Sequence, residues 1–313
     1  MCRHLAYLGP PASLRSLLID PPHSLYRQAW APRLQRHGTV NADGFGVGWY
    51  ADGDPVPARY RRSAPIWGDL SLPDIARVTR SGAVLAAVRS ATQGTALGEA
   101  AAAPFGAGPW LFSHNGLLDG WPGAAAAIAD RASQAGGQGD GPPAPGSLPR
   151  PSSAAALLSL EAMVDSAFLW ALVLGRLRAG SAMDAALAGT IAAVEAAGGT
   201  GRFNFLLTDG HSVAATACGD TLWYRLTGEG APASAVVASE PCDDEPGWTE
   251  VPGRHLLTAT ARGVSVQPLA AGVRTAPEAP EAPVSSTTAG AFPAPGHVST
   301  TDIDVSTEGI ATR

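Results

Sequence analysis

Short apolar runs at both ends of the chain flank a middle region with a longer period. In residues 1–124, alternating or continuous hydrophobic runs are bounded by Gly, Pro and Asp, which is typical of strands joined by turns. The same pattern returns from residue 203. We expect strands at residues 3–8, 45–50, 84–89, 110–113, 203–208, 212–218, 222–226, 235–239 and 255–260.

The region between them has the period of helices. Residues 165–180, DSAFLWALVLGRLRAG, are apolar on nearly every side, which predicts a buried helix capped by Asp165 or Ser166. SAMD at 181–184 has the pattern of a capping box and predicts a second helix that ends near Gly198. The order strands, helices, strands predicts an α+β fold with largely antiparallel sheets.

Two segments have too few large apolar side chains to form a packed core. Residues 131–155 are rich in Gly, Pro and Ser, which predicts a flexible, low-complexity loop. Residues 276–313 are rich in Pro, Ala, Ser and Thr, which predicts a disordered tail. The chain is therefore expected to have one folded domain over residues 1–275.

Charge and composition exclude several classes of partner. The formal net charge is -6 and the pI is about 5.6, so we expect no nucleic-acid partner. No apolar run reaches the roughly 18 residues of a membrane span, and the N-terminus lacks a signal-peptide pattern. Three cysteines are too few for a disulfide framework. A cytoplasmic protein with free thiols is the expectation.

One of these cysteines stands at position 2, in the opening MCRHLAYLG. Removal of Met1 is expected because the next side chain is small, and Cys2 would then carry a free α-amine. An α-amine, with a pKa of about 7.7–8.0, can accept the proton of the thiol. Because a small buried cysteine is the more ordinary use of such a position, this hypothesis depends on partners elsewhere.

Three motifs offer such partners. In SHNGLLDGW, the side chain of Asn115 and the N–H of Gly116 suit an oxyanion, although Asn-Gly also forms plain turns. In VRSATQG, Arg89 ends an apolar strand and suits either a substrate carboxylate or an internal salt bridge. Asp165 opens the apolar helix, as an N-cap or as an anchor for a substrate ammonium group. No Cys or His spacing indicates a metal site, and no cofactor is expected.

Cys2, RSATQG, HNG and VDS before a helix occur together and in this order. The chain thereby resembles the N-terminal-nucleophile (Ntn) glutaminase domain of class II glutamine amidotransferases, over nearly all of residues 1–270. The resemblance implies a four-layer αββα Ntn-hydrolase sandwich with two mainly antiparallel sheets. It also implies that Cys2 attacks the carbonyl of a γ-glutamyl amide to form a thioester, with the α-amine as base.

The resemblance further implies roles for single residues. Asn115 and the Gly116 N–H match the oxyanion hole. Arg89 matches the residue that holds the α-carboxylate of the glutamyl group, and Asp165 the one that holds its α-amine. The remaining expected substrate-binding residues are Thr92 and His114, whereas Gln93 stands where many members of the family have His.

Within the family, residues 1–50 and the stretch VVASEPCDDEPGWTEVPGRHLL are similar to the γ-glutamyl hydrolases of ergothioneine biosynthesis. The substrate of that subgroup carries a trimethylammonium group, which proteins usually hold between aromatic rings. Tyr26, Trp30 and Trp67 fall in loops near the inferred site. We expect at least one of them to face the leaving-group side, although core packing is the commoner use of Trp.

Two other functions are compatible with the same motifs. One is a stand-alone glutaminase that supplies ammonia to a partner, and the other is a non-catalytic regulatory subunit. An amidotransferase needs a second site that consumes ammonia, and no sequence after residue 270 is expected to fold into one. All five residues expected in the site occur in the order of the family motifs, namely Cys2, Arg89, Asn115, Gly116 and Asp165. Their presence favours a hydrolase with a small-molecule γ-glutamyl substrate.

Overall fold

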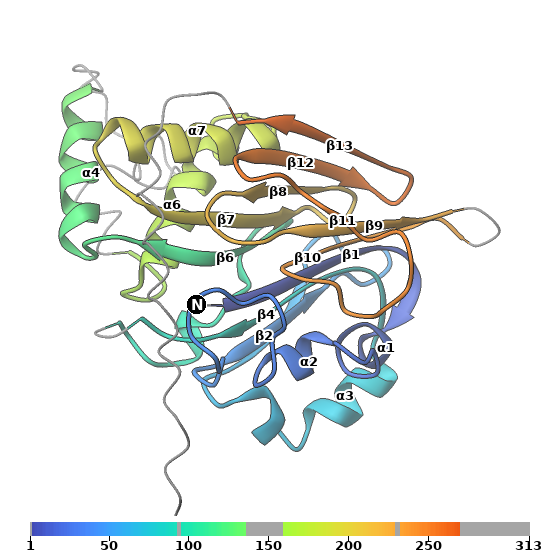
Figure 1. The fold of residues 1–313 in the computed structure, drawn as a ribbon. Coiled ribbons are helices and arrows are strands. Elements are labelled where there is room, and N and C mark those ends of the chain that lie inside the picture. The colour runs from blue at the N-terminus through green and yellow to red at the C-terminus, as the bar shows by residue number, and fades with distance from the viewer. Residues whose placement is uncertain (1, 93–94, 136–158, 229–231, 270–313) are drawn as a thin grey trace, which may run out of the picture. The chain divides into compact units, whose positions relative to one another are not determined.

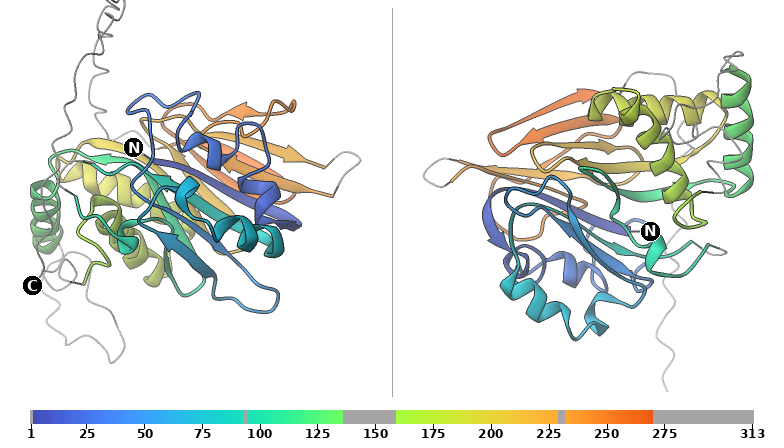
Figure 2. Two further views of the ribbon diagram at one scale, coloured as in Figure 1. Left: turned by 90° about the horizontal axis from the view of Figure 1, so that it is seen from below. Right: turned by 180° about the vertical axis from the view of Figure 1, so that it is seen from behind.

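The computed structural model describes residues 2–92, 95–135, 159–228 and 232–269. Two antiparallel sheets lie face to face, and helices cover the outer face of each (Figures 1 and 2). The predicted α+β class and the four-layer αββα arrangement are confirmed. The predicted tail from residue 276 and residues 136–155 of the predicted loop lie outside the described residues.

The first sheet has seven strands in the order β11-β9-β10-β1-β4-β2-β3. Helices α1 (Leu14–Leu18), α2 (Leu25–Gln28) and α3 (Leu72–Val78) cover its outer face, where their leucines pack against β1 side chains such as Leu5 and Tyr7. The strands are β1 (Cys2–Ser13), β2 (Phe45–Trp49), β3 (Ala58–Arg62), β4 (Arg80–Arg89), β9 (Trp223–Thr227), β10 (Ser234–Ala238) and β11 (Thr249–Glu250).

The second sheet has six strands in the order β13-β12-β8-β7-β6-β5. Helices α6 (Asp165–Arg178) and α7 (Met183–Ala196) cover its outer face, and α4 (Gly123–Ala135) lies beside them (Figure 1). The strands are β5 (Phe105–Ala107), β6 (Trp110–Leu118), β7 (Gly201–Thr208), β8 (Val213–Ala217), β12 (His255–Thr260) and β13 (Gly263–Pro268).

A third hydrophobic cluster fills the space between the sheets. It includes Ala6 and Leu8 of β1, Leu85 of β4, Leu111 of β6 and Leu206 of β7. Because successive side chains of a strand point to opposite faces, Cys2 and His4 lie on the same inward face as Ala6. The N-terminal end of β1 therefore presents Cys2 to the second sheet.

Three local predictions need correction. The strand expected to end at residue 113 continues to Leu118, so Asn115-Gly116 lies inside β6 and is not a turn. Residues 131–135, expected in the loop, belong to α4. The N-cap positions of α6 and α7 are Val164 and Ala182, without side-chain caps, so neither the Asp165/Ser166 cap nor the SAMD capping box forms.

No described helix is long and apolar enough to cross a membrane.

Candidate active site

Cys2 begins β1, the central strand of the seven-stranded sheet, and it is partly exposed. Its direct cross-strand partner is Arg89, the last residue of β4. Directly opposed residues share one face of a sheet, with Cβ atoms about 4.5–5.5 Å apart. The register of β1 and β4 thus brings together two residues that are 87 positions apart in the chain.

Asn115 of β6 reaches Cys2 from the other sheet. The backbone nitrogen of Cys2 donates a hydrogen bond to Asn115 Oδ1 over 3.2 Å. Asn115 is fully buried, and its Nδ2 has no hydrogen-bond partner among the described residues. Removal of Met1 would convert the bonded nitrogen into the α-amine. That amine would lie within hydrogen-bond distance of Asn115 Oδ1, beside the unpartnered Nδ2.

The hydrogen bonding of Asn115 differs from that of the neighbouring Asn204. Asn204 is the cross-strand partner of Asn115 on β7 and is equally buried. Its Oδ1 accepts from the N–H groups of Cys218 and Asp220, and its Nδ2 donates to two backbone carbonyls. A buried donor without a partner costs about 1–3 kcal/mol, so the free Nδ2 of Asn115 indicates a place for a bound acceptor.

Gly116 is required where β6 approaches β7. A Cβ atom on this residue would collide with the carbonyl oxygen of Arg202 and with the ring of His114. Larger residues would therefore force β7 away from β6 and displace Asn115. This steric demand accounts for the glycine independently of any role for its N–H.

Arg89 is buried and hydrogen-bonded to neutral groups. Its Nη2 donates to Thr95 Oγ1 over 3.2 Å and to the Ala96 carbonyl over 3.0 Å, and its Nη1 lies 3.4 Å from the Asp43 carbonyl. No carboxylate forms an ion pair with it in the described part of the chain, so the internal salt bridge considered from sequence does not form. Its positive charge therefore remains available to an anionic ligand.

Asp43 organises the segment that follows Arg89, a role that the sequence did not reveal. Its N–H donates to the Arg89 carbonyl over 2.9 Å, and its carboxylate accepts from the N–H of Ala91 over 2.7 Å. The next turn is closed by Thr95, whose N–H and hydroxyl both donate to the Thr92 carbonyl. Nothing in the local pattern NADGFG at residues 41–46 indicated a contact 48 residues away.

Asp165 is the first residue of α6 and is buried. Its Oδ2 accepts from the N–H of Leu118, at the end of β6, over 2.9 Å, and its Oδ1 accepts from the N–H of Ser166 over 2.8 Å. The N–H of Ala96 lies 3.5 Å from the Met163 carbonyl, so the segment after Arg89 meets the segment before Asp165. The two charged residues therefore stand on contacting segments.

His114 is a buried residue of β6, next to Asn115. Its side chain points to the helical side of the second sheet, where Nδ1 lies 3.0 Å from Ser166 Oγ and Nε2 lies 2.9 Å from the Arg202 carbonyl. Burial lowers the pKa of His114, and the Asp165 carboxylate opposes that effect. Protein groups from α6 and β7 therefore lie within hydrogen-bond distance of both ring nitrogens, and substrate binding by His114 stays a prediction.

His4 is a further buried residue of this region that the sequence did not single out. It lies on the same face of β1 as Cys2, with Nδ1 3.2 Å from Ser113 Oγ of β6. Its Nε2 has no partner among the described residues. Burial lowers the pKa of His4 to about 3, and the charges of His114 and Arg3 act in the same direction. The ring is therefore neutral near pH 7.

The neutral state of His4 predicts a loss of stability in acid. Below the ordinary pKa of 6.5 the unfolded chain binds a proton that the folded chain excludes until about pH 3. The contribution of His4 is therefore complete above pH 6.5 and falls by about 2 kcal/mol between pH 6.5 and 5.0. Urea unfolding at these two pH values should show a smaller decrease for His4→Gln than for the parent. Equal decreases would contradict the prediction.

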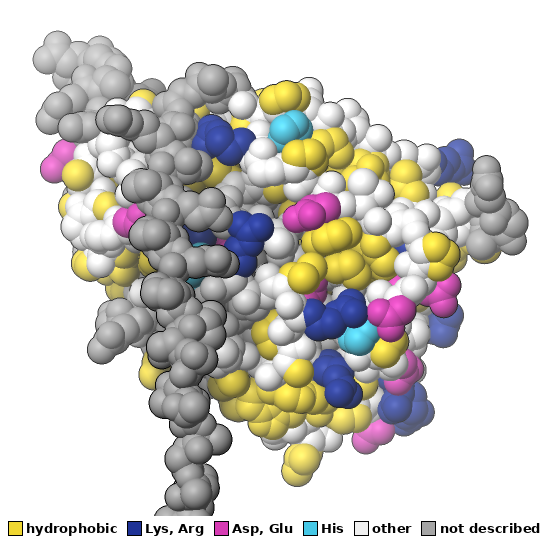
Figure 3. Space-filling view, in the orientation of Figure 1, with side chains coloured by type: hydrophobic (Ala, Val, Ile, Leu, Met, Phe, Trp, Pro, Cys, Tyr) yellow, Lys and Arg dark blue, Asp and Glu magenta, His cyan; other side chains and the backbone are white. Residues whose placement is uncertain are grey.

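Tyr26, Trp30 and Trp67 form one aromatic cluster. The ring of Trp30 stands edge to face with Tyr26 at 5.3 Å and with Trp67 at 5.6 Å between centroids. Trp30 is 40% exposed and Trp67 is 38% exposed, so core packing does not account for these two rings. In Figure 3, hydrophobic side chains gather on the lower part of the visible face, in the region of α2.

The segment that carries this cluster leads back to the site. The N–H of Asn41 donates to the Ala29 carbonyl over 2.6 Å, and its side chain donates to the Gln28 carbonyl over 3.0 Å. Two residues later, Asp43 contacts Arg89. The aromatic cluster and Arg89 are thus joined through a short hydrogen-bonded segment.

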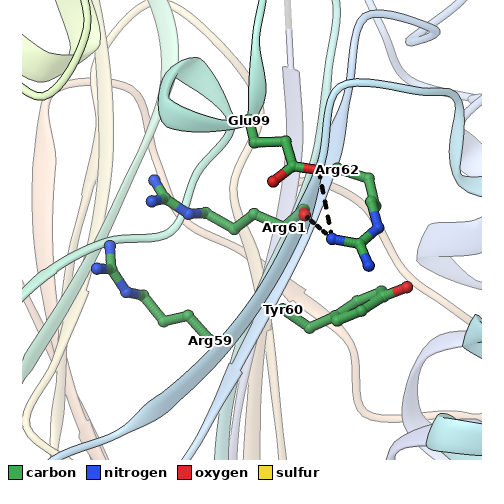
Figure 4. Close-up of a pocket in the computed structure, with 5 residues that line it drawn as sticks. All are labelled: Arg59, Tyr60, Arg61, Arg62 and Glu99. Atoms are coloured by element: carbon green, nitrogen blue, oxygen red, sulfur yellow. Dashed lines mark hydrogen bonds and ion pairs between the residues drawn. The ribbon is translucent and has the colours of Figure 1, made fainter.

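An open pocket of about 330 Å³ lies elsewhere, on the edge strand β3 (Figure 4). Acidic side chains neutralise its arginines. Arg59 and Arg61 both pair with Glu161, and Arg62 pairs with Glu99. None of the residues expected to act on substrate lines this pocket, which is lined by Arg59, Tyr60, Arg61, Arg62 and Glu99.

Among the described residues no group of three or more acidic, His or Cys side chains could hold a metal ion.

Curated relatives match nearly the whole domain. The chain is 41% identical over 269 residues to the gamma-glutamyl-hercynylcysteine sulfoxide hydrolase of Mycolicibacterium smegmatis, covering 86% of this chain and 100% of the relative. It is 40% identical over 269 residues to the protein of the same name from Mycobacterium tuberculosis, covering 86% of this chain and 97% of the relative. No family model matches the chain.

Solved structures agree with these relatives. A glutamine aminotransferase class-II domain protein from Silicibacter pomeroyi superposes with a TM-score of 0.54 at 26% identity, covering 86% of this chain and 100% of that one. The two-sheet architecture and the near-complete coverage of the relatives agree with the resemblance noted from the motifs. The chain belongs to the family of gamma-glutamyl-hercynylcysteine sulfoxide hydrolases, which has the fold of class II glutamine amidotransferases.

Proposed function

We propose that this protein hydrolyses the γ-glutamyl amide of γ-glutamyl-hercynylcysteine sulfoxide, releasing glutamate and hercynylcysteine sulfoxide in ergothioneine biosynthesis. The observation that supports the chemistry most directly is the pair formed by Cys2 and Asn115. One side-chain oxygen of Asn115 accepts from the nitrogen of Cys2 over 3.2 Å, while its amide nitrogen is buried without a partner. A nucleophile, its base and an oxyanion donor thereby meet at one point.

The first half of the reaction forms a thioester. The α-amine of Cys2 accepts the thiol proton, and the sulfur attacks the γ-carbonyl carbon of the glutamyl group. The carbonyl oxygen becomes an oxyanion, to which Asn115 Nδ2 and the Gly116 N–H donate. When the tetrahedral intermediate collapses, the C–N bond breaks, and the departing amine takes the proton from the α-ammonium group.

The second half consumes one water molecule. The α-amine accepts a proton from the water molecule, and the oxygen of this water attacks the thioester carbon. The same donors hold the second oxyanion. The C–S bond then breaks, the α-ammonium group returns its proton to the sulfur, and glutamate leaves. The balance is one amide bond hydrolysed, with no oxidant, reductant or cofactor consumed.

The glutamyl end is common to glutamine and to all γ-glutamyl conjugates. We assign its α-carboxylate to Arg89, whose charge is not neutralised by an ion pair among the described residues, and its α-ammonium group to Asp165. We also propose that Thr92, on the turn after Arg89, contacts the same group. These residues recognise the acyl half and do not distinguish one leaving group from another.

A direct comparison of two substrates tests the proposal. Purified protein is incubated with γ-glutamyl-hercynylcysteine sulfoxide and, separately, with glutamine, and glutamate and ammonia are quantified. Glutamate release from the conjugate at a much higher kcat/KM supports the proposed function. Preferential release of ammonia from glutamine would favour a glutaminase, and inactivity on both would favour a regulatory subunit.

The aromatic cluster predicts selectivity for the trimethylammonium part of the leaving group. A contact between a cation and an aromatic ring contributes about 0.5–2 kcal/mol, so Trp30→Ala should lower kcat/KM for the conjugate by about 2–30-fold. Hydrolysis of glutamine should change little. Trp248→Ala, which removes a partly buried ring stacked with Arg225, is the matched control. A proportional loss with both substrates would exclude a cage at Trp30.

A further inference from the structure

The leaving group of the proposed reaction has a charge that glutamine lacks. In a γ-glutamyl amide of a cysteine derivative, the scissile nitrogen is the α-nitrogen of the cysteine. A carboxylate is therefore attached to the carbon next to the scissile bond. A cation on that side of Cys2 would favour this leaving group over ammonia, in addition to any contact with the trimethylammonium group.

We propose that Arg202, held by Asp220, binds this leaving-group carboxylate; the inference rests on the proposed function. Arg202 is on β7 opposite Leu117, two residues beyond the pair Asn115–Asn204. Alternation places Arg202 on the same face of the sheet as Asn115, the face that meets Cys2. Diagonal neighbours across two strands lie about 7–8 Å apart, a distance that an arginine side chain spans.

Asp220 fixes the guanidinium of Arg202. Its Oδ2 accepts from Arg202 Nε over 3.2 Å, and its side chain is 1% exposed compared with 22% for Arg202. The backbone of Asp220 is held by Asn204 through two hydrogen bonds. The pair therefore combines a buried carboxylate with a more exposed arginine side chain, and a guanidinium held in this way suits a planar contact with a ligand carboxylate.

The position of Asp220 next to the site has independent support. Burial lowers the pKa of both Arg3 and His114, and in both cases the Asp220 carboxylate opposes that effect. Arg3 Nη1 also lies 3.5 Å from Thr221 Oγ1, so the residue after Asp220 contacts the residue after Cys2. The other carboxylate oxygen of Asp220, Oδ1, is buried and has no partner among the described residues. The site thus retains an acceptor for a donor of the ligand.

A double-mutant-type cycle tests the assignment, in which the parent enzyme and Arg202→Gln are each assayed with two substrates. The substrates are γ-glutamyl-hercynylcysteine sulfoxide and its decarboxy analogue, in which cysteamine replaces cysteine. Arg202→Gln should lower kcat/KM for the first by about 10–100-fold, as expected for a hydrogen-bonded charge, and should change little for the analogue. The parent enzyme should show a similar preference between the two substrates, because each change removes the same contact.

The controls separate this proposal from a structural role and from the proposed function. Arg225→Gln removes another half-buried arginine that is paired with an aspartate, Asp243 at 2.7 Å, and should not change the preference. Arg202→Lys should retain part of the preference for the conjugate over its decarboxy analogue, because lysine keeps the positive charge. Equal losses with both substrates, or no loss with either, would overturn the role of Arg202. A parent enzyme that cleaves neither substrate would instead overturn the proposed function.

Discussion

Replacing Cys2 with Ala is expected to abolish glutamate release from the γ-glutamyl conjugate and to leave the fold unchanged. Cys2 is partly exposed at the first position of β1, so its side chain contributes little packing. Its contribution is chemical, because no other group of the site can form the thioester. Steady-state assays with a detection limit of about 10⁻⁴ of the parent rate would measure the loss, and thermal unfolding would verify the fold.

Cys2→Ser should retain at most a trace of activity, because a hydroxyl is harder to activate than a thiol. A sequence fused before Met1 should also inactivate the enzyme until it is cleaved, since it blocks the α-amine. An undiminished rate in Cys2→Ala would refute the mechanism.

The other two cysteines provide matched controls for loss of a thiol. Cys218 and Cys242 are buried, and burial raises the pKa of Cys218 and raises that of Cys242 to about 12. Both thiols are therefore protonated near pH 7. Substituting either with Ala should lower the free energy of unfolding through lost packing and should preserve turnover in the fraction that remains folded.

Much of the fold could be predicted because its strands and long helices have regular apolar periods. The expected runs correspond to β1, β2, β4 and most strands of the second half, and the helix expected over 165–180 is α6, which ends at Arg178. The short elements were missed. Helices α1 and α2 have only 5 and 4 residues, too few to display a helical period, and the arginine-rich β3 is an exposed edge without an apolar face.

The candidate site could be predicted only as far as its motifs are local. Cys2, Arg89 and Asn115 are recognisable from short stretches, and the structure brings these three together. Residues whose partners are distant in the chain left no local signal. Asp43 contacts Ala91, His4 faces Ser113, and Arg202 pairs with Asp220, each through the register between strands or through a loop contact.

The end of β6 illustrates how a local rule can mislead. Asn-Gly commonly marks a turn, and here it lies in the middle of a strand. The glycine is present because the Arg202 carbonyl occupies the space of a side chain. The asparagine is present although its amide nitrogen has no partner among the described residues. A buried side chain that leaves one of its hydrogen-bonding groups without a partner is expected at a functional site.

Asn115→Ala is expected to lower kcat by about 10²–10³, the usual effect of losing one oxyanion donor. KM should change much less, because the interaction strengthens only as charge develops on the carbonyl oxygen. The variant also loses the acceptor for the nitrogen of Cys2, which is 3.2 Å from Oδ1 in the parent. Alanine alone therefore cannot separate orientation of the base from stabilisation of the oxyanion.

Asn115→Asp separates the two roles. The substitution keeps an oxygen that accepts from the α-amine, replaces the Nδ2 donor with a second acceptor and adds a negative charge. We expect a loss at least as large as that of Asn115→Ala, because the charge repels the oxyanion. The carboxylate should also stabilise the α-ammonium form and raise the pKa of the amine, which moves the acidic limb of the kcat/KM profile to higher pH. If Asn115→Asp turns over at nearly the parental rate, the free donor is unnecessary, and Asn115 acts only by orienting the nitrogen of Cys2.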